Sequence, residues 1–169
     1  GHELTHGFDN TGRKHDKYGN YIQWWSNKTI GTFENMTKCF VNQYDNYTID
    51  GVRGHVKGKV TLGENLADNG GLNQAYTAYQ SYKQRNGAEG KLPGFETYND
   101  EQMFFIAYGS IWCETATVRD IEDQLEYDEH APNYIRVIGT LQNSPEFSKA
   151  FQCPKNTPMN PIRPKCKIW

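Results

Sequence analysis

Two histidines and a glutamate stand close together at the start of the chain and could form a metal site. His2, Glu3 and His6 form the pattern His-Glu-x-x-His. On a helix, residues four apart lie on one face, so both imidazoles would point to the same place. This pattern is typical of zinc sites in which the histidines bind the metal and the glutamate acts on a water molecule. Chance can also produce it in a chain with five histidines, so a third ligand has to be found.

The third ligand is expected to be an acid on a second helix. A hydrolytic zinc site has three protein ligands and one open position. The metzincin pattern would place glycine at position 9 and histidine at position 12, where this chain has Asp9 and Gly12. Glu64 and Asp68 are four residues apart, so one carboxylate can bind the metal while the other hydrogen-bonds a ligating histidine. As an isolated pair, the two acids would be solvated helix residues.

Four further helices are expected to position these groups. Residues 26–47 have apolar side chains at helical spacing, and residues 61–85 form a long helix that stops at Asn86 and Gly87. This long helix contains Gly70 and Gly71, where we expect another backbone to come close. A third helix is predicted over residues 100–112 with Asp100 as its N-cap, and a short fourth one begins at residues 144–146.

Composition limits the class of protein. A chain of 169 residues is long enough for one domain with a core. The net charge of −2 and the lack of a basic block give no reason to expect nucleic acid as a partner. No apolar run reaches the length of a membrane span.

Glycosylation triplets and cysteines point to the secretory pathway. Asn27, Asn35 and Asn46 each begin an Asn-x-Thr triplet, which is an acceptor for N-glycosylation. The even number of cysteines and their wide spacing suit disulfides better than a zinc ribbon. Buried free thiols in a cytosolic protein are the alternative.

Longer motifs resemble the zinc endopeptidases of the neprilysin and endothelin-converting enzyme family. Residues 1–9 (GHELTHGFD) and residues 61–72 (TLGENLADNGGL) resemble the two zinc motifs of that family. Further matches follow in order to the end of the chain: Phe104-Phe105, Trp112-Cys113, His130-Ala131-Pro132, residues 136–144, Met159-Asn160-Pro161 and residues 166–169. The resemblance implies a mainly α-helical fold with few short strands, the C-terminal portion of a thermolysin-like (gluzincin) catalytic domain. Residues 1–169 would be a single-domain fragment of it.

The resemblance also implies a metal and its ligands. One zinc ion per chain would be bound by His2, His6 and Glu64. Asp9 and Asp68 match the acids that hydrogen-bond the ligating histidines, and we count Asp68 among the catalytic residues.

Further residues match the family's catalytic and substrate-binding groups. Glu3 corresponds to the general base and acid, and His130, with Asp128 as its acidic neighbour, corresponds to the histidine that stabilises the oxyanion. Arg136 corresponds to the arginine that binds the substrate carbonyl beyond the scissile bond. The expected substrates are short peptides, cut on the amino side of hydrophobic residues. Without the resemblance, a lone histidine and a lone arginine would be read as surface residues.

The family pattern includes segments that lie outside this sequence. The family's first zinc helix has preceding turns, and an upstream Asn-Ala motif binds the substrate backbone. We therefore expect the 169 residues alone to bind zinc weakly and to show little or no peptidase activity. By the same resemblance, Cys39 pairs with Cys166, whereas Cys113 and Cys153 pair with cysteines of an N-terminal part of the same protein.

Location and alternative functions follow from the same comparison. We expect an extracellular or cell-surface ectodomain, either secreted or attached to the membrane only through an N-terminal anchor outside these residues. The first alternative is a catalytically inactive fragment or family member that acts as an extracellular peptide-binding module. The second is a cytosolic zinc peptidase of another family, in which the three asparagine triplets would carry no glycans.

Overall fold

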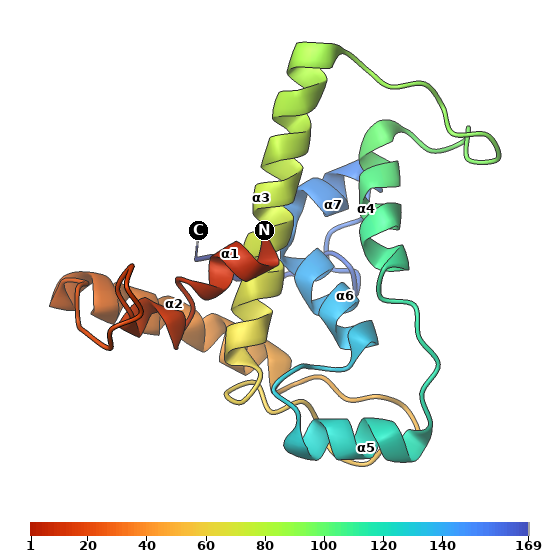
Figure 1. The fold of residues 1–169 in the computed structure, drawn as a ribbon. Coiled ribbons are helices and arrows are strands. Elements are labelled where there is room, and N and C mark those ends of the chain that lie inside the picture. Colours follow the sequence, from red (N-terminus) through yellow and green to blue (C-terminus); the bar gives the residue numbers. More distant parts are fainter. Residues whose placement is uncertain (169) are drawn as a thin grey trace.

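The computed structural model describes residues 1–168, which fold into a mainly helical structure (Figure 1). Over these residues, the only β pairing consists of two isolated bridges, His15–Tyr21 and Thr157–Asn160. No helix in this part of the chain is both long enough and apolar enough to cross a membrane. In chain order the elements are α1 (His2–His6), the 3-10 helix η1 (Gly12–Lys14), α2 (Asn27–Tyr44), α3 (Leu62–Asn86), α4 (Asp100–Ser110), α5 (Val118–Tyr127), α6 (Asn133–Asn143) and α7 (Pro145–Ala150).

The helices expected from apolar spacing are present, and their ends follow the local capping chemistry. The side chain of Ser26 accepts a hydrogen bond from the backbone of Thr29 at the start of α2. Helix α3 ends at Asn86 and is capped by Gly87, whose φ of 81° suits a residue without a side chain. Helix α7 starts as predicted, with Ser144 as its cap and Pro145 in its first turn.

Helix α4 differs from the prediction in its cap and in its end. The N-cap is Asn99 instead of Asp100: Asn99 accepts from the backbone of Gln102, whose side chain accepts from the backbone of Asn99. This reciprocal pair satisfies two free N–H groups at once, which a cap at Asp100 would not achieve. The helix ends at Ser110, two residues before the predicted Trp112.

Two helices, α5 and α6, were not predicted. The signal for α5 is a reciprocal cap between Thr117 and Asp120, followed by Ile121 and Leu125 on one face. Helix α6 begins after Pro132 without a side-chain cap, so it lacks the usual N-terminal signal. Helix α6 carries Arg136, so its position determines part of the site described below.

Helix α3 is the central element and lies against α1, α2 and α6 (Figure 1). One core cluster joins α2 to the first half of α3 and to α6 through Phe40, Tyr44, Leu66 and Ile135, all at most 2% exposed. The second joins α3 to α4, α6 and α7 through Leu72, Phe105, Leu141 and Phe147. Packing of this kind fixes α3 on both sides, so groups along it are held rigidly relative to α6.

A disulfide fastens the C-terminal tail to α2. Cys39 is bonded to Cys166, as the resemblance implied, with Cα atoms 5.6 Å apart. Asn143, at the end of α6, supports this tail by accepting hydrogen bonds from Arg163 and from the backbone of Cys166. The tail therefore closes a loop of 127 residues that includes every helix after α2.

Removing this disulfide should strongly destabilise the fold. For a loop of this length the chain-entropy model gives a loss of about 4 to 5 kcal/mol in the free energy of unfolding. We expect that loss for the Cys39→Ala/Cys166→Ala double variant, measured by urea denaturation. Each single variant should lose about as much as the double variant, because either change removes the same bond. Additive losses from the two single variants would contradict this account.

Candidate metal centre

Helix α1 lies directly on α3 because two glycines allow their backbones to meet. A Cβ atom on Gly71 would lie 2.6 Å from the backbone nitrogen of His2, and one on Gly1 would lie 2.6 Å from the carbonyl oxygen of Gly71. The expected close backbone approach at Gly70 and Gly71 is therefore present at Gly71. Gln74 on α3 adds a hydrogen bond to the buried Thr5 of α1. The short α1 is thus held by packing.

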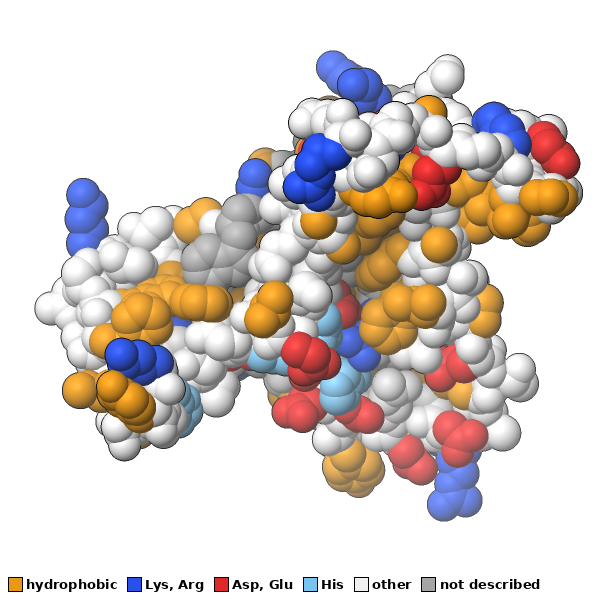
Figure 2. All heavy atoms as spheres, turned by 45° about the horizontal axis from the view of Figure 1, so that its top comes forward, with side chains coloured by type: hydrophobic (Ala, Val, Ile, Leu, Met, Phe, Trp, Pro, Cys, Tyr) orange, Lys and Arg blue, Asp and Glu red, His pale blue; other side chains and the backbone are white. Residues whose placement is uncertain are grey.

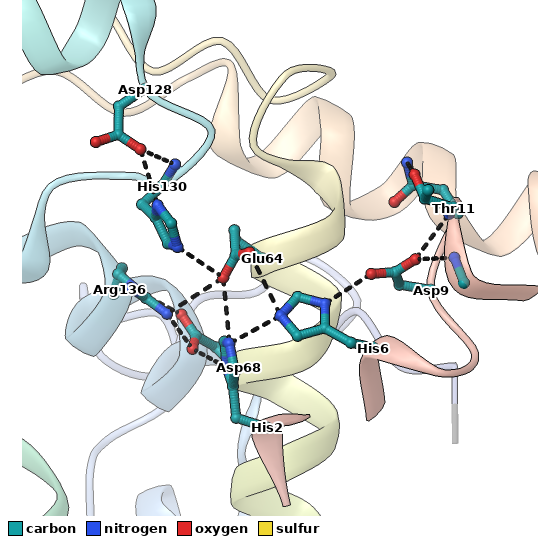
Figure 3. Close-up of polar contacts among 11 residues, drawn as sticks. His2, His6, Asp9, Thr11, Glu64, Asp68, Asp128, His130 and Arg136 are labelled. Atoms are coloured by element: carbon teal, nitrogen blue, oxygen red, sulfur yellow. Dashed lines mark hydrogen bonds and ion pairs between the residues drawn. The ribbon is translucent and has the colours of Figure 1, made fainter. Parts of the chain in front are cut away.

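Three potential ligands converge where α1 crosses α3 (Figure 3). The Nε2 atoms of His2 and His6 are 3.0 Å apart. The Glu64 carboxylate lies 3.2 Å from His2 Nε2 and 3.3 Å from His6 Nε2. Two atoms that bind one zinc ion tetrahedrally at about 2.0 to 2.1 Å are themselves about 3.3 Å apart. The spacing of these three groups therefore matches that of ligands around one zinc ion.

The hydrogen bonds of the two imidazoles leave both Nε2 atoms to face the same point. His2 Nδ1 lies 2.8 Å from Asp68 and His6 Nδ1 lies 2.7 Å from Asp9. Carboxylates only accept hydrogen bonds, so each Nδ1 carries a proton, and in its neutral form each ring presents a lone pair at Nε2. The buried Oε2 atom of Glu64 has no hydrogen-bond partner within the described chain. Two lone pairs and a buried carboxylate oxygen facing one point fit a divalent cation.

The carboxylates that orient the histidines are themselves fixed. Asp9 is buried, and its Oδ1 accepts hydrogen bonds of 2.7 Å from the backbones of Thr11 and Gly12. Asp68 is 3% exposed, and its hydrogen bond to His2 raises the pKa of that imidazole. Both acids therefore set the ring orientation and tautomer of a histidine.

Asp68 also forms a buried, bidentate ion pair with Arg136. Arg136 Nε and Nη2 each donate to Asp68 over 2.8 Å. Burial opposes the charge of Arg136, but the hydrogen bonds and charge of Asp68 outweigh it, so the pKa of Arg136 is raised. A second Arg136 contact runs from Nη2 to Glu64 at 3.6 Å. Arg136 thereby joins helix α6 to Asp68 and Glu64 on α3.

His130 approaches the same group from the loop between α5 and α6. Its Nε2 lies 3.2 Å from Glu64 Oε2, and its Nδ1 and backbone nitrogen each lie 2.8 Å from Asp128. Burial works against the charge of Asp128, but its hydrogen bonds from His130 lower its pKa overall. Asp128 thus fixes the orientation of the His130 ring toward Glu64, although the His130 side chain is 38% exposed.

A hollow of about 680 Å³ opens beside this centre. Figure 2 shows histidine and acidic side chains in the middle of this face, next to a recess walled by hydrophobic side chains. Glu3 is exposed and lines the hollow together with His130 and Arg136. The apolar wall comes from α3, α4 and the residues that follow α4: Leu72, Ala75, Phe104, Ala107, Tyr108, Ile111 and Trp112.

The structure brings together the residues that were predicted to act on metal and substrate. His2, His6, Glu64, Asp68, His130 and Arg136 form one group, with Glu3 on the rim and Asp9 and Asp128 behind the histidines. The predicted glycosylation asparagines and the disulfide lie elsewhere, on or near α2.

Sequence reasoning missed two contacts of this site. The Asp68–Arg136 ion pair joins residues 68 positions apart, and Trp112 lies against the guanidinium of Arg136. Nothing in the local sequence around either contact indicates it. A predicted α6 packed on α3 would have placed Arg136 near Asp68.

The comparisons with known proteins agree with one another. The family model described as peptidase family M13 matches residues 1–168. Among curated relatives, an endothelin-converting enzyme homolog of Locusta migratoria is 51% identical over 169 residues, and human neprilysin is 47% identical over 170. Both alignments cover 100% of this chain, but only 23% and 22% of the relatives. The chain thus spans less than a quarter of the length of these relatives.

Solved structures resemble the chain over nearly its whole length. An inhibitor complex of a zinc metalloprotease from Mycobacterium tuberculosis has a TM-score of 0.89 and 32% identity, and the alignment covers 100% of this chain and 26% of that one. A Haemonchus galactose-containing glycoprotein complex has a TM-score of 0.87 and 38% identity, over 99% of this chain and 28% of that one.

Proposed function

The chain belongs to peptidase family M13, and on this premise we propose that it forms the zinc-binding part of a metalloendopeptidase. The observation that carries the proposal is the convergence of His2 Nε2, His6 Nε2 and the Glu64 carboxylate within 3.3 Å of one another. We propose these three groups as the ligands of one zinc ion. A bound zinc ion would supply a Lewis acid that activates water and polarises the peptide carbonyl.

The remaining residues would position the substrate and move protons. Glu3, at the rim of the hollow, would accept a proton from the attacking water and pass it to the leaving amine. His130, whose Nδ1 donates to Asp128, would in its protonated form also donate a hydrogen bond from Nε2 to the negative charge that develops on the carbonyl oxygen. Arg136 would hold the carbonyl beyond the scissile bond, and Asp68 would hold both His2 and Arg136 in place.

The hollow supports the proposed substrate class. Its apolar wall lies beside both His2 and Arg136, so a peptide bond at the metal centre would place a neighbouring side chain against it. Its volume is in the range that accommodates side chains or small ligands. We propose short peptides as substrates, cut on the amino side of a hydrophobic residue that occupies this wall.

The surface supports a secreted or cell-surface location. Asn27, Asn35 and Asn46 are all exposed, so their side chains are accessible to glycosylation. The Cys39–Cys166 disulfide also suits an oxidising compartment. Cys113 is exposed and Cys153 is partly exposed, and both are free thiols, which is compatible with bonds to cysteines in another part of the same protein.

Removal of the metal tests the proposed function. The substrate is a quenched short peptide with a hydrophobic residue after the scissile bond, and the enzyme is the full-length gene product that carries these residues. A chelator should lower the hydrolysis rate at least about a hundredfold, because metal activation contributes several kcal/mol. Adding zinc back should restore the rate, and metal analysis should find one zinc ion per chain.

Two other outcomes would each have a clear meaning. Hydrolysis that persists in the chelator after the metal has been removed would refute the metal mechanism. A protein that holds zinc and binds the peptide without cutting it would favour the peptide-binding alternative.

A further inference from the structure

The Arg136 guanidinium lies over the indole ring of Trp112, next to the candidate metal centre. The Cζ atom of Arg136 is 4.2 Å from the centre of the indole ring. This is within the range in which a cation is attracted to an aromatic face, and tryptophan is the best partner for it. Trp112 is partly buried, so less water competes for the guanidinium there.

Two different contacts therefore fix Arg136 in two different directions. Asp68 binds one edge of the guanidinium through Nε and Nη2, which prevents rotation within the plane. The indole ring of Trp112 lies against the guanidinium from another side, with Cζ 4.2 Å from the ring centre, and restricts movement of the group in that direction. Arg136 and Trp112 both line the hollow.

The position of Trp112 is in turn coupled to helix α6. Tyr108, one turn earlier on α4, donates a hydrogen bond of 3.4 Å to the carbonyl oxygen of Arg136. The rings of Tyr108 and Trp112 pack edge to face, with centres 6.3 Å apart. The end of α4 therefore contacts the middle of α6 at both the carbonyl oxygen and the guanidinium of Arg136.

We propose that Trp112 is a positioning residue that holds the guanidinium of Arg136 in the orientation needed to bind the substrate carbonyl. The inference rests on the proposed function, in which Arg136 makes that contact. Trp112 also lines the hollow, so a second role as a simple apolar wall has to be separated from positioning. The two roles differ in which contact of the substrate weakens when the indole is lost. Positioning predicts a weaker contact of the carbonyl, and an apolar wall predicts a weaker contact of the hydrophobic side chain.

Two matched peptide inhibitors separate the roles. Both carry the same metal-binding group and the same hydrophobic side chain, but only one retains the carbonyl that Arg136 would contact. In the full-length gene product, Trp112→Leu should weaken the carbonyl-bearing inhibitor about tenfold more than its carbonyl-free partner. Trp112→Phe keeps an aromatic face and should recover part of that difference.

Ile111→Ala is the control for loss of apolar wall. Ile111 lines the same hollow beside Trp112 but is not one of the contacts of the Arg136 guanidinium described above. This change should weaken both inhibitors by the same factor. Equal weakening of both inhibitors by Trp112→Leu would show that Trp112 is only a wall and would overturn the inference.

Failure of the proposed function would look different. A wild-type protein that binds neither inhibitor would overturn the proposed function and the inference with it. Where the wild type binds both inhibitors, a selective loss for the carbonyl-bearing one in Trp112→Phe supports the inference even if Trp112→Leu does not fold. If Trp112→Leu does not fold, an unchanged ratio of the two affinities in Trp112→Phe contradicts it.

Discussion

Replacing Glu3 by glutamine should lower the rate of peptide hydrolysis about a thousandfold and leave the zinc content unchanged. Glu3 follows directly after His2 but is not one of the three convergent groups. It lines the hollow and is exposed, so it is placed to reach a water molecule at the centre. Loss of a general base typically costs a factor of 10² to 10⁴, and an amide of the same shape cannot accept the proton.

The measurement compares the catalytic rate with the metal content of the same preparation. Glu89→Gln is a matched control, because it removes another exposed carboxylate from the loop between α3 and α4 and should change neither quantity. A Glu3→Gln protein within tenfold of the wild-type rate would rule out Glu3 as the base. Loss of zinc from that variant would instead mean that Glu3 takes part in holding the metal.

The part of the site that could be predicted from sequence is the part set by helix periodicity. His2 and His6 are four residues apart, as are Glu64 and Asp68, so each pair shares one helix face whatever the rest of the chain does. The meeting of the two pairs depends on the backbone contact at Gly71, and the two adjacent glycines in the sequence indicated a contact there. Local spacing and one packing signal were thus enough to place four groups.

The roles of His130 and Arg136 came from the family resemblance and not from local spacing. His130 lies in a loop, and its position depends on Asp128, a hydrogen-bond partner two residues away. Arg136 is on α6, a helix without a side-chain cap, and its main partner is 68 residues distant. Long-range partners such as Asp68 and Trp112 follow from the packing of helices, which single-sequence patterns do not encode.

Replacing Asp68 by alanine should weaken both the fold and the metal site. Asp68 is 3% exposed and is hydrogen-bonded to His2 Nδ1, Arg136 Nε and Arg136 Nη2, each at 2.8 Å. Without it the buried guanidinium of Arg136 loses its main partner, which typically costs about 3 to 5 kcal/mol. His2 would lose the acceptor that fixes its ring and tautomer, and such losses reduce metal affinity about 10- to 100-fold.

Asp9→Ala separates these two effects, because the Asp9 carboxylate orients His6 and is otherwise hydrogen-bonded to the backbones of Thr11 and Gly12, not to Arg136. Both variants should therefore lose zinc affinity by a similar factor in competition with a chelator. Denaturation with urea should show the larger loss of stability for Asp68→Ala, since only that change leaves the buried guanidinium of Arg136 without its ion-pair partner. A double variant, Asp68→Ala/Arg136→Met, also removes the unpaired guanidinium. It should recover much of the stability while the zinc affinity stays low. If the double variant is no more stable than Asp68→Ala alone, the cost does not arise from the unpaired guanidinium, and Asp68 acts on the fold through its packing instead.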